Sequence, residues 1–220
     1  MKILFACLLL VLASFVSQAQ TLSDNFNDGV PDTALWNVGT GFVGYSFTYT
    51  PDVVTVSEAS GGLVFTQQAG LSEGGANAYS TIASYDVFGK RVSAKLSRAG
   101  GLQVYLAVGS SPSEVTIVSL ENGGSGTMVK FQTRDLDQYD QYDFVYIAPA
   151  NYDPAQQVYL GLRFTRRGVY CETSPDGVVW TTVGLLKERL IMSTPRRWNL
   201  VGACSIRMPE RRLVKLMTLK

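Results

Sequence analysis

The chain has 220 residues, a formal net charge of +1 and no histidine. The lack of histidine excludes Ser-His-Asp and Cys-His catalysis and any histidine-ligated zinc site. The charge is uneven, because the segment from Gly161 onward has 12 Lys and Arg against 4 Asp and Glu. This segment either forms a patch for an anionic partner or interleaves with the acidic first part in space. We favour interleaving and expect no nucleic-acid partner, since no nucleic-acid motif accompanies the basic residues.

The first 19 residues have the pattern of a secretory signal peptide. Met1 and Lys2 form a short basic start, residues 3–16 are apolar, and residues 17–19 read Ser-Gln-Ala, a small-x-small cleavage site. The apolar run is too short for a membrane-spanning helix, which needs about 20 residues. We therefore expect a bacterial secreted or periplasmic protein whose residues 20–220 form a single domain without membrane insertion.

The first part of the mature chain is rich in turn residues. Residues 32–36 read Asp-Thr-Ala-Leu-Trp and resemble one capped helical turn that delivers Trp36. Strands are predicted at Val53–Ser57 and Gly62–Gln68, on either side of a glycine turn. We expect all three tryptophans, Trp36, Trp180 and Trp198, to fill the core, because large aromatic residues at strand ends normally do.

Clean period-two alternation begins after Tyr85 and recurs along the chain. Further strands are predicted at 115–120, 128–134, 198–204 and 212–218, and Val183–Met192 is the only candidate for a short helix. This pattern, with turns every ten or so residues, predicts an all-β fold: a two-sheet antiparallel jelly-roll-like β-sandwich. The apolar residues predicted to face the core are Val92, Ala94, Leu96, Leu102, Val104, Leu106, Val108, Val158, Leu160, Leu162 and Phe164.

The clearest local signal is a β-hairpin over residues 170–181. Residues 175–177 read Pro-Asp-Gly, which predicts a three-residue loop with Gly177 in a left-handed conformation and a strand that resumes at Val178. Cys171 either forms a disulfide with Cys204 or lies buried as a free thiol. Glu172 faces opposite to Cys171. If Cys171 lies inside, Glu172 is the hairpin carboxylate left for an open groove and the first to inspect for catalysis.

Two stretches resemble a known family. Residues 24–36 contain Asp24-x-Phe26-x-Asp28-Gly29 and Trp36, and residues 170–180 contain Tyr-x-Glu-x-Ser-Pro-Asp-Gly-x-x-Trp. Together they resemble the concanavalin A-like lectin/glucanase superfamily, including secreted laminin G-like domains. The resemblance implies a sandwich that serves lectins, adhesion modules, glycosidases or lyases. It also allows a structural Ca²⁺ at Asp24 and Asp28, which we interpret instead as turn and cap residues. The glucanase motif Glu-x-Asp-x-x-Glu is absent.

Residues 134–143 form the most distinctive polar stretch. Asp135 and Asp137 are candidate Ca²⁺ ligands, with Asp140 and Asp143 nearby, although the spacing is not that of an EF-hand loop. Tyr139 and Tyr142 are candidate sugar-stacking residues, because sugar binding combines flat aromatic faces with polar groups. The alternative is a solvated acidic loop without a ligand.

The outward positions of two alternating strands form a second candidate surface. Gln103 and Tyr105 on one strand, and Tyr159 and Arg163 on another, would line a ligand-binding groove if the two strands are neighbours in a concave sheet. The alternative is ordinary cross-strand pairing, with Tyr chosen for its β-propensity.

Function is less determined than fold. We expect recognition of a polysaccharide or cell-surface glycan without catalysis. A first alternative is a glycoside hydrolase or polysaccharide lyase that uses a carboxylate pair not recognisable in the sequence. A second alternative is a structural surface or appendage protein. No cofactor is expected other than a structural Ca²⁺.

Overall fold

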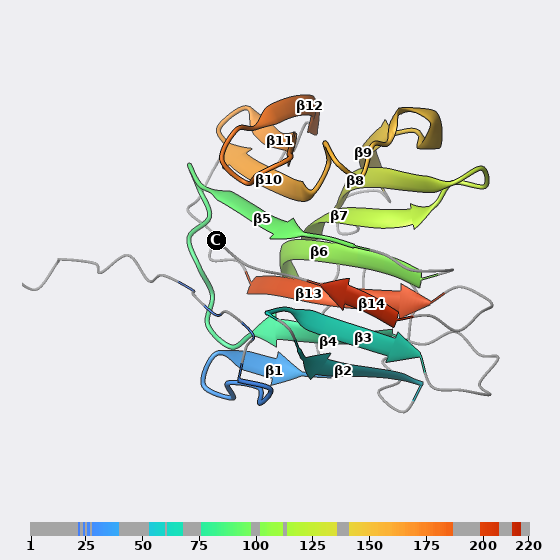
Figure 1. Ribbon diagram of the computed structural model, residues 1–220. Helices are drawn as coiled ribbons and strands as arrows, with labels where there is room; N and C mark the ends of the chain where they lie inside the picture. Colours follow the sequence, from blue (N-terminus) through green and yellow to red (C-terminus); the bar gives the residue numbers. More distant parts are fainter. Residues whose placement is uncertain are drawn as a thin grey trace, which may run out of the picture.

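The computed structural model describes residues 22, 24, 26, 28–39, 53–59, 61–67, 76–97, 102–111, 114–135, 141–186, 199–206 and 213–216. In these ranges the chain is built from antiparallel strands, with one turn of 3-10 helix at Pro149–Asn151 (Figure 1). Nowhere in this described part is a helix long and apolar enough to cross a membrane.

The larger layer is a seven-stranded sheet in the order β1-β4-β13-β6-β7-β8-β9. Strand β13 lies between β4 and β6, so a late strand joins two early ones at the centre of the sheet. The strands are β1 (Trp36–Val38), β4 (Ala76–Thr81), β13 (Asn199–Ile206), β6 (Leu102–Ser111), β7 (Glu114–Asn122), β8 (Thr127–Asp135) and β9 (Gln141–Ile147).

The second layer consists of two smaller sheets. One is four-stranded, in the order β12-β11-β10-β5, and the other is three-stranded, in the order β14-β3-β2. Figure 1 shows the first beside β6–β9 and the second beside β4 and β13. Their strands are β12 (Thr181–Leu186), β11 (Gly168–Ser174), β10 (Tyr159–Thr165), β5 (Arg91–Lys95), β14 (Leu213–Leu216), β3 (Leu63–Gln67) and β2 (Val54–Glu58).

One hydrophobic core joins the layers, because Phe65 of β3 and Leu162 of β10 belong to the same buried cluster as Leu106 and Phe131 of the seven-stranded sheet. The predicted β-sandwich is therefore confirmed. Val158 is only half-buried and precedes β10, so the predicted alternation fails there. At the other positions whose side chains are described, the inward residues of three strands are buried. These are Val92, Ala94, Leu96, Val104, Leu106, Val108, Leu160, Leu162 and Phe164.

The capped turn at the start of the domain is also confirmed. The backbone N–H groups of Leu35 and Trp36 donate to the Asp32 carbonyl, and the Asp32 carboxylate caps Ala34. Trp36 then enters the core and packs against Phe26 and Tyr79.

Two predictions around the hairpin were wrong. Residues 183–186 are part of strand β12, not of a helix, and residues 187–192 lie outside the described part. A bulge between Cys171 and Glu172 shifts the register of β11 against β12, so Val183 and Leu186 both reach the core although they are three residues apart. Helix-like spacing thus arises in a strand.

The second error concerns the loop between these strands. Gly177 has the predicted positive φ, 76°. However, β12 begins at Thr181, so the loop is longer than three residues. The cause is Asp176, whose carboxylate accepts the backbone N–H groups of Val178 and Val179 and holds both in the turn.

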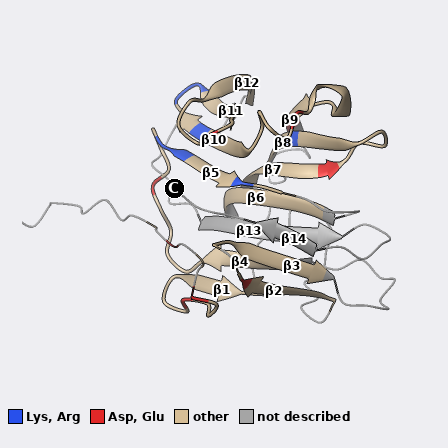
Figure 2. Cartoon of the chain, in the orientation of Figure 1, with Lys and Arg blue, Asp and Glu red and all other residues tan. Residues whose placement is uncertain are grey.

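The C-terminal strands interleave with early strands, as favoured from the charge pattern. Besides β13, strand β14 pairs with β3. Among the described residues, basic positions nevertheless remain on β5 and β10 of the four-stranded sheet (Figure 2). Cys171 is a fully buried free thiol, so the disulfide with Cys204 is not formed, and burial raises the pKa of this thiol to about 12.

Candidate functional site

The outer face of the seven-stranded sheet, which points away from the core, has an apolar centre. Ala78, Tyr105, Ala107 and Val115 form a separate buried cluster there, and Ile117 packs against it. Tyr105 therefore does point away from the core, as predicted. It does not lie on a wet surface, because only 4% of the residue is exposed.

Polar groups gather beside this apolar centre. Glu121 Oε1 accepts hydrogen bonds from the Ser119 hydroxyl at 2.6 Å and from the Gln103 amide at 3.2 Å. The Lys130 ammonium lies 3.9 Å from the same oxygen. Neighbouring positions on β6, β7 and β8 thus converge on one carboxylate that is 22% exposed.

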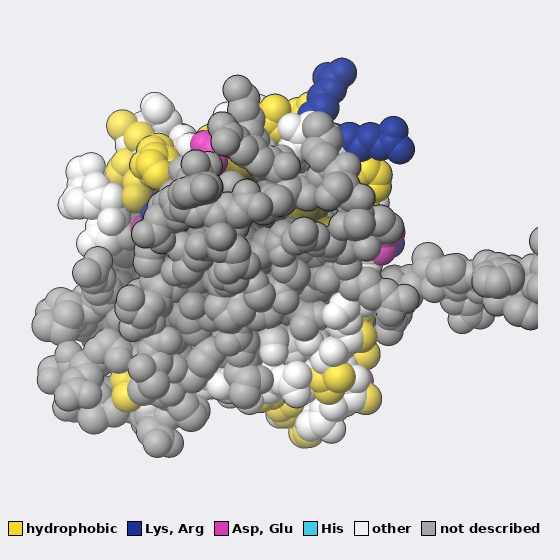
Figure 3. Space-filling view, turned by 180° about the vertical axis from the view of Figure 1, so that it is seen from behind, with side chains coloured by type: hydrophobic (Ala, Val, Ile, Leu, Met, Phe, Trp, Pro, Cys, Tyr) yellow, Lys and Arg dark blue, Asp and Glu magenta, His cyan; other side chains and the backbone are white. Residues whose placement is uncertain are grey.

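Two exposed aromatic residues continue this face on the edge strand β9. Tyr146 pairs with Lys130, and Phe144 pairs with Gln132. Their ring centroids lie 5.1 Å apart, and they are 50% and 46% exposed. In the view from behind, apolar side chains gather at the upper left, where this edge lies (Figure 3). We call Gln103, Ser119, Glu121, Lys130, Phe144 and Tyr146 the β7–β9 surface.

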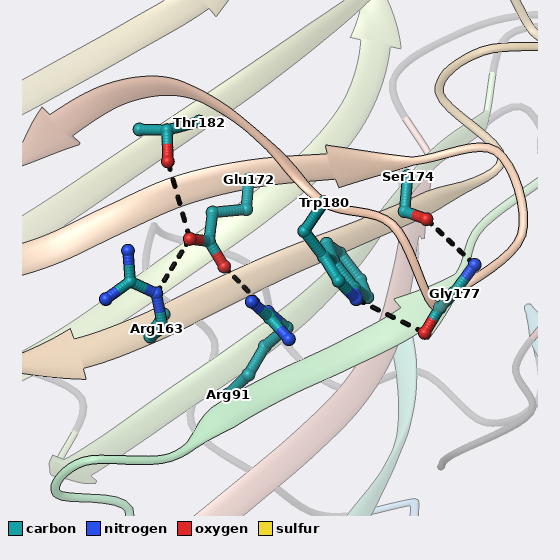
Figure 4. Close-up of polar contacts among 7 residues, drawn as sticks. All are labelled: Arg91, Arg163, Glu172, Ser174, Gly177, Trp180 and Thr182. Atoms are coloured by element: carbon teal, nitrogen blue, oxygen red, sulfur yellow. Dashed lines mark hydrogen bonds and ion pairs between the residues drawn. The ribbon is translucent and has the colours of Figure 1, made fainter.

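A second polar cluster lies on the outer face of the four-stranded sheet, in the other layer of the sandwich. Figure 4 shows its side chains. Glu172 accepts a hydrogen bond from Arg91 Nε at 2.6 Å and another from Arg163 Nε at 2.7 Å. The Thr182 hydroxyl lies 3.4 Å from the same carboxylate. Glu172 is thus opposite to the buried Cys171, as predicted, but it is 4% exposed and neutralised by two cations instead of open to a groove.

Aromatic rings flank both arginines. The Arg91 guanidinium lies 4.4 Å from the Trp180 ring centroid, and that of Arg163 lies 4.3 Å from Tyr170. Trp180 is half-buried on this face, so its predicted place in the core was wrong. The reason is Gly161, where a Cβ would come within 2.7 Å of the indole, so only glycine leaves room for the ring to lie on the sheet. Trp198 lies outside the described residues.

A third group of carboxylates lies where β2 meets the N-terminal segment. Glu58 is buried, and its pKa is raised to about 7, first by burial and then by Asp28 and Asp24 nearby. Burial, together with the charge of Glu58, also raises the pKa of Tyr79. Asp24 accepts hydrogen bonds from Phe26 N–H and the Trp36 indole, as a turn residue does.

The predicted metal and sugar residues are only partly described. Asp135 ends β8 and Tyr142 lies in β9, and the structure describes only the backbone of these two residues. Asp137 and Tyr139 lie outside the described residues. In the described part of the chain, no group of three or more acidic, cysteine or histidine side chains could hold a metal ion. The Ca²⁺ site at Asp135 and Asp137 therefore stays a prediction.

The four residues predicted to line one groove are divided between two layers. Gln103 and Tyr105 are on β6 of the seven-stranded sheet, and Tyr159 and Arg163 are on β10 of the four-stranded sheet. Because these strands belong to different sheets, the four side chains form no common surface. A role in ligand binding stays a prediction for each separately.

Sequence reasoning missed the residues that complete both clusters. Glu121 stands outside any glucanase motif, but alternation along β7 puts it on the same face as Ser119 and could have indicated it. Arg91 is, in the sequence, only one polar position on its strand. Its partner Glu172 is 81 residues away, and no local pattern could have paired them.

No family model matches the sequence, and no curated protein matches it either. Solved structures match its fold. A β-1,3-glucanase from Mycobacterium marinum has a TM-score of 0.62 at 11% identity, covering 93% of this chain and all of its own. The catalytic domain of an endo-1,3-β-glucanase (laminarinase) from Thermotoga petrophila has a TM-score of 0.57 at 12% identity, covering 91% and 97%.

A third structure is a non-specific endo-β-1,3(4)-glucanase from family GH16, with a TM-score of 0.58 at 13% identity and 90% of each chain covered. The protein thus has the concanavalin A-like jelly-roll fold that its two sequence stretches indicated. Identities this low show the fold alone.

Proposed function

We propose that this protein is a glycoside hydrolase that acts on a glucan-type polysaccharide lying across the β7–β9 surface. The observation that carries the proposal is the exposed pair Phe144 and Tyr146, which continues a face where Glu121, Lys130 and Gln103 converge. Glycan recognition needs this combination, because ring faces contact sugar C–H groups and polar groups bind hydroxyls. The fold match to endo-1,3-β-glucanases supports hydrolysis over recognition alone.

In the proposed mechanism Glu121 is the reacting carboxylate of this face. Glycosidases pass through an oxocarbenium-like transition state that one carboxylate stabilises, either as nucleophile or by charge, while a second carboxylic acid protonates the leaving oxygen. Glu121 would supply the first of these groups, and the second would come from outside the β7–β9 surface. Hydrogen bonds from Ser119 and Gln103 fix the Glu121 carboxylate in one orientation. Lys130, 3.9 Å away, can donate to a substrate hydroxyl beside it.

The second candidate function is polysaccharide binding without cleavage. Hydrolysis of this kind uses two carboxyl groups about 5–10 Å apart. Among the residues of the β7–β9 surface, Glu121 is the one carboxylate. That single observation favours a lectin-like role as the alternative.

The experiment that separates these functions is incubation of the purified protein with laminarin and with a mixed-linkage β-glucan. Hydrolysis predicts new reducing ends on at least one polymer, and binding alone predicts retarded migration in a gel that contains the polymer. If no new reducing ends appear with either polymer, the proposed hydrolysis is wrong, and if migration is also unchanged, the binding alternative is wrong as well. We further propose that the protein is exported, which N-terminal sequencing of the mature form would test by showing a start at Gln20.

A further inference from the structure

A second ligand site, separate from the β7–β9 surface, is indicated by an excess of charge on the four-stranded sheet. Arg91 and Arg163 are directly opposite each other in the register of β5 and β10. Like charges in this position repel each other. Glu172 is the one carboxylate that contacts both among the described residues, so the three side chains keep a net charge of +1.

The guanidinium groups keep donors for a ligand. Each guanidinium has five N–H donors, and the bond to Glu172 engages only Nε. Among the described residues, neither arginine makes another hydrogen bond or ion pair. Their side chains are 30% and 34% exposed, so solvent reaches both.

Both guanidinium groups are held in place before any ligand arrives. Glu172 fixes one side of each, and the rings of Trp180 and Tyr170 lie against them. The Trp180 indole is itself fixed by a hydrogen bond to the Gly177 carbonyl at 3.2 Å. Such a site loses little side-chain entropy when it binds, which favours affinity.

The chemistry of the site selects the ligand. Planar guanidinium groups recognise carboxylate, sulfate and phosphate oxygens. Trp180 lies against Arg91, and the turn that precedes it exposes Val178 and Val179, which are 74% and 65% exposed and offer apolar contact. Lys95 on β5 is exposed as well, so positive charge continues along the strand. A polymer with repeated negative charges can contact both the arginine pair and Lys95, whereas a single ion cannot.

We propose that the outer face of the four-stranded sheet binds an anionic polysaccharide, with Arg91 and Arg163 holding a carboxylate or sulfate group beside Trp180. This site does not depend on hydrolysis at Glu121, because the two lie on opposite outer faces of the sandwich. Its ligands are anionic polymers, so its failure is distinguishable from failure of the neutral-glucan proposal.

The test is affinity electrophoresis of the whole protein against dextran sulfate, polygalacturonate and unmodified dextran at low salt. Binding to dextran sulfate alone assigns a sulfate site, and binding to polygalacturonate alone assigns a carboxylate site. Arg91→Gln should weaken the interaction about tenfold, the usual effect of one charge-assisted contact. Arg167→Gln is the matched control, since it removes the same charge from an exposed turn outside the cluster, and should weaken binding less than about twofold.

A further variant keeps the test decisive if Arg91→Gln does not fold. Trp180→Ala leaves the ion pairs to Glu172 intact and should weaken binding severalfold. Thermal unfolding establishes that each variant is folded. The proposal is overturned if neither anionic polymer is retarded more than dextran, or if Arg167→Gln weakens binding as much as Arg91→Gln.

Discussion

Each outer face of the sandwich carries a carboxylate, and the two carboxylates differ in exposure and in partners. On the seven-stranded sheet, Glu121 is partly exposed and its contacts include two neutral donors, Ser119 and Gln103. On the four-stranded sheet, Glu172 is almost fully buried between two arginines. The first arrangement leaves a carboxylate accessible for chemistry, whereas the second uses the carboxylate to position two cations. A carboxylate on a sheet face is thus informative only together with its partners.

The largest expected effect is on stability, and it separates the two carboxylates. Glu172→Ala leaves two arginines opposite each other without a counter-charge and should lower the free energy of unfolding by about 3 kcal/mol. Glu121→Ala removes a partly exposed group and should cost less than about 1 kcal/mol. Urea unfolding measures both. Equal losses of unfolding free energy in the two variants would show that Glu172 is no more important for stability than Glu121.

Glu58 extends the comparison to a buried carboxylate that has no cationic partner among the residues that the structure describes. Its pKa is about 7 in the folded protein, against 4.5 for an unperturbed glutamate side chain. Between these values the unfolded chain loses the proton first, so the contribution of Glu58 to stability is fully present below pH 4.5 and is lost as the pH rises to 7. The loss should reach about 3 kcal/mol. Urea unfolding over this range, compared with Glu58→Gln, measures the effect. A Glu58→Gln variant with an unchanged pH profile would contradict this assignment.

The aromatic pair on β9 should affect binding and not folding. Tyr146→Ala removes a half-exposed ring beside Lys130 and should weaken glucan binding by about 1 kcal/mol, or roughly fivefold. Phe88→Ala is the control, because Phe88 is similarly exposed at 42% but lies outside the β7–β9 surface. Affinity electrophoresis in laminarin gels reports both. A larger loss of glucan binding in Phe88→Ala than in Tyr146→Ala would show that the glucan site lies outside the β7–β9 surface.

A substitution at Gly161 tests the geometry of the arginine cluster. Gly161→Ala places a Cβ within 2.7 Å of Trp180, so the indole must move away from Arg91. We expect a shift in tryptophan fluorescence and a loss of about 1 kcal/mol in stability. An unchanged spectrum would show that the ring does not lie on the sheet.

The sequence was sufficient for the sandwich, because alternation along β5, β6 and β10 is a local property: every second side chain of a strand faces the core. It was insufficient at β12, where the bulge opposite Cys171 and Glu172 leaves Val183 without a partner in β11 and gives helix-like spacing. It also misplaced Trp180, since Gly161 is 19 positions away and makes room for the ring only once β10 and β11 pair. Both clusters join residues from different strands, so their composition depends on register and not on motif.

Laminarin hydrolysis by the wild-type protein and by Glu121→Gln, with binding measured in parallel, tests the role of Glu121 directly. We expect the wild type to release reducing ends. The variant should bind laminarin equally well but release them at least about a hundredfold more slowly, because an amide cannot stabilise the transition-state charge. Equal rates for the two proteins, or no release by the wild type, would contradict hydrolysis at Glu121.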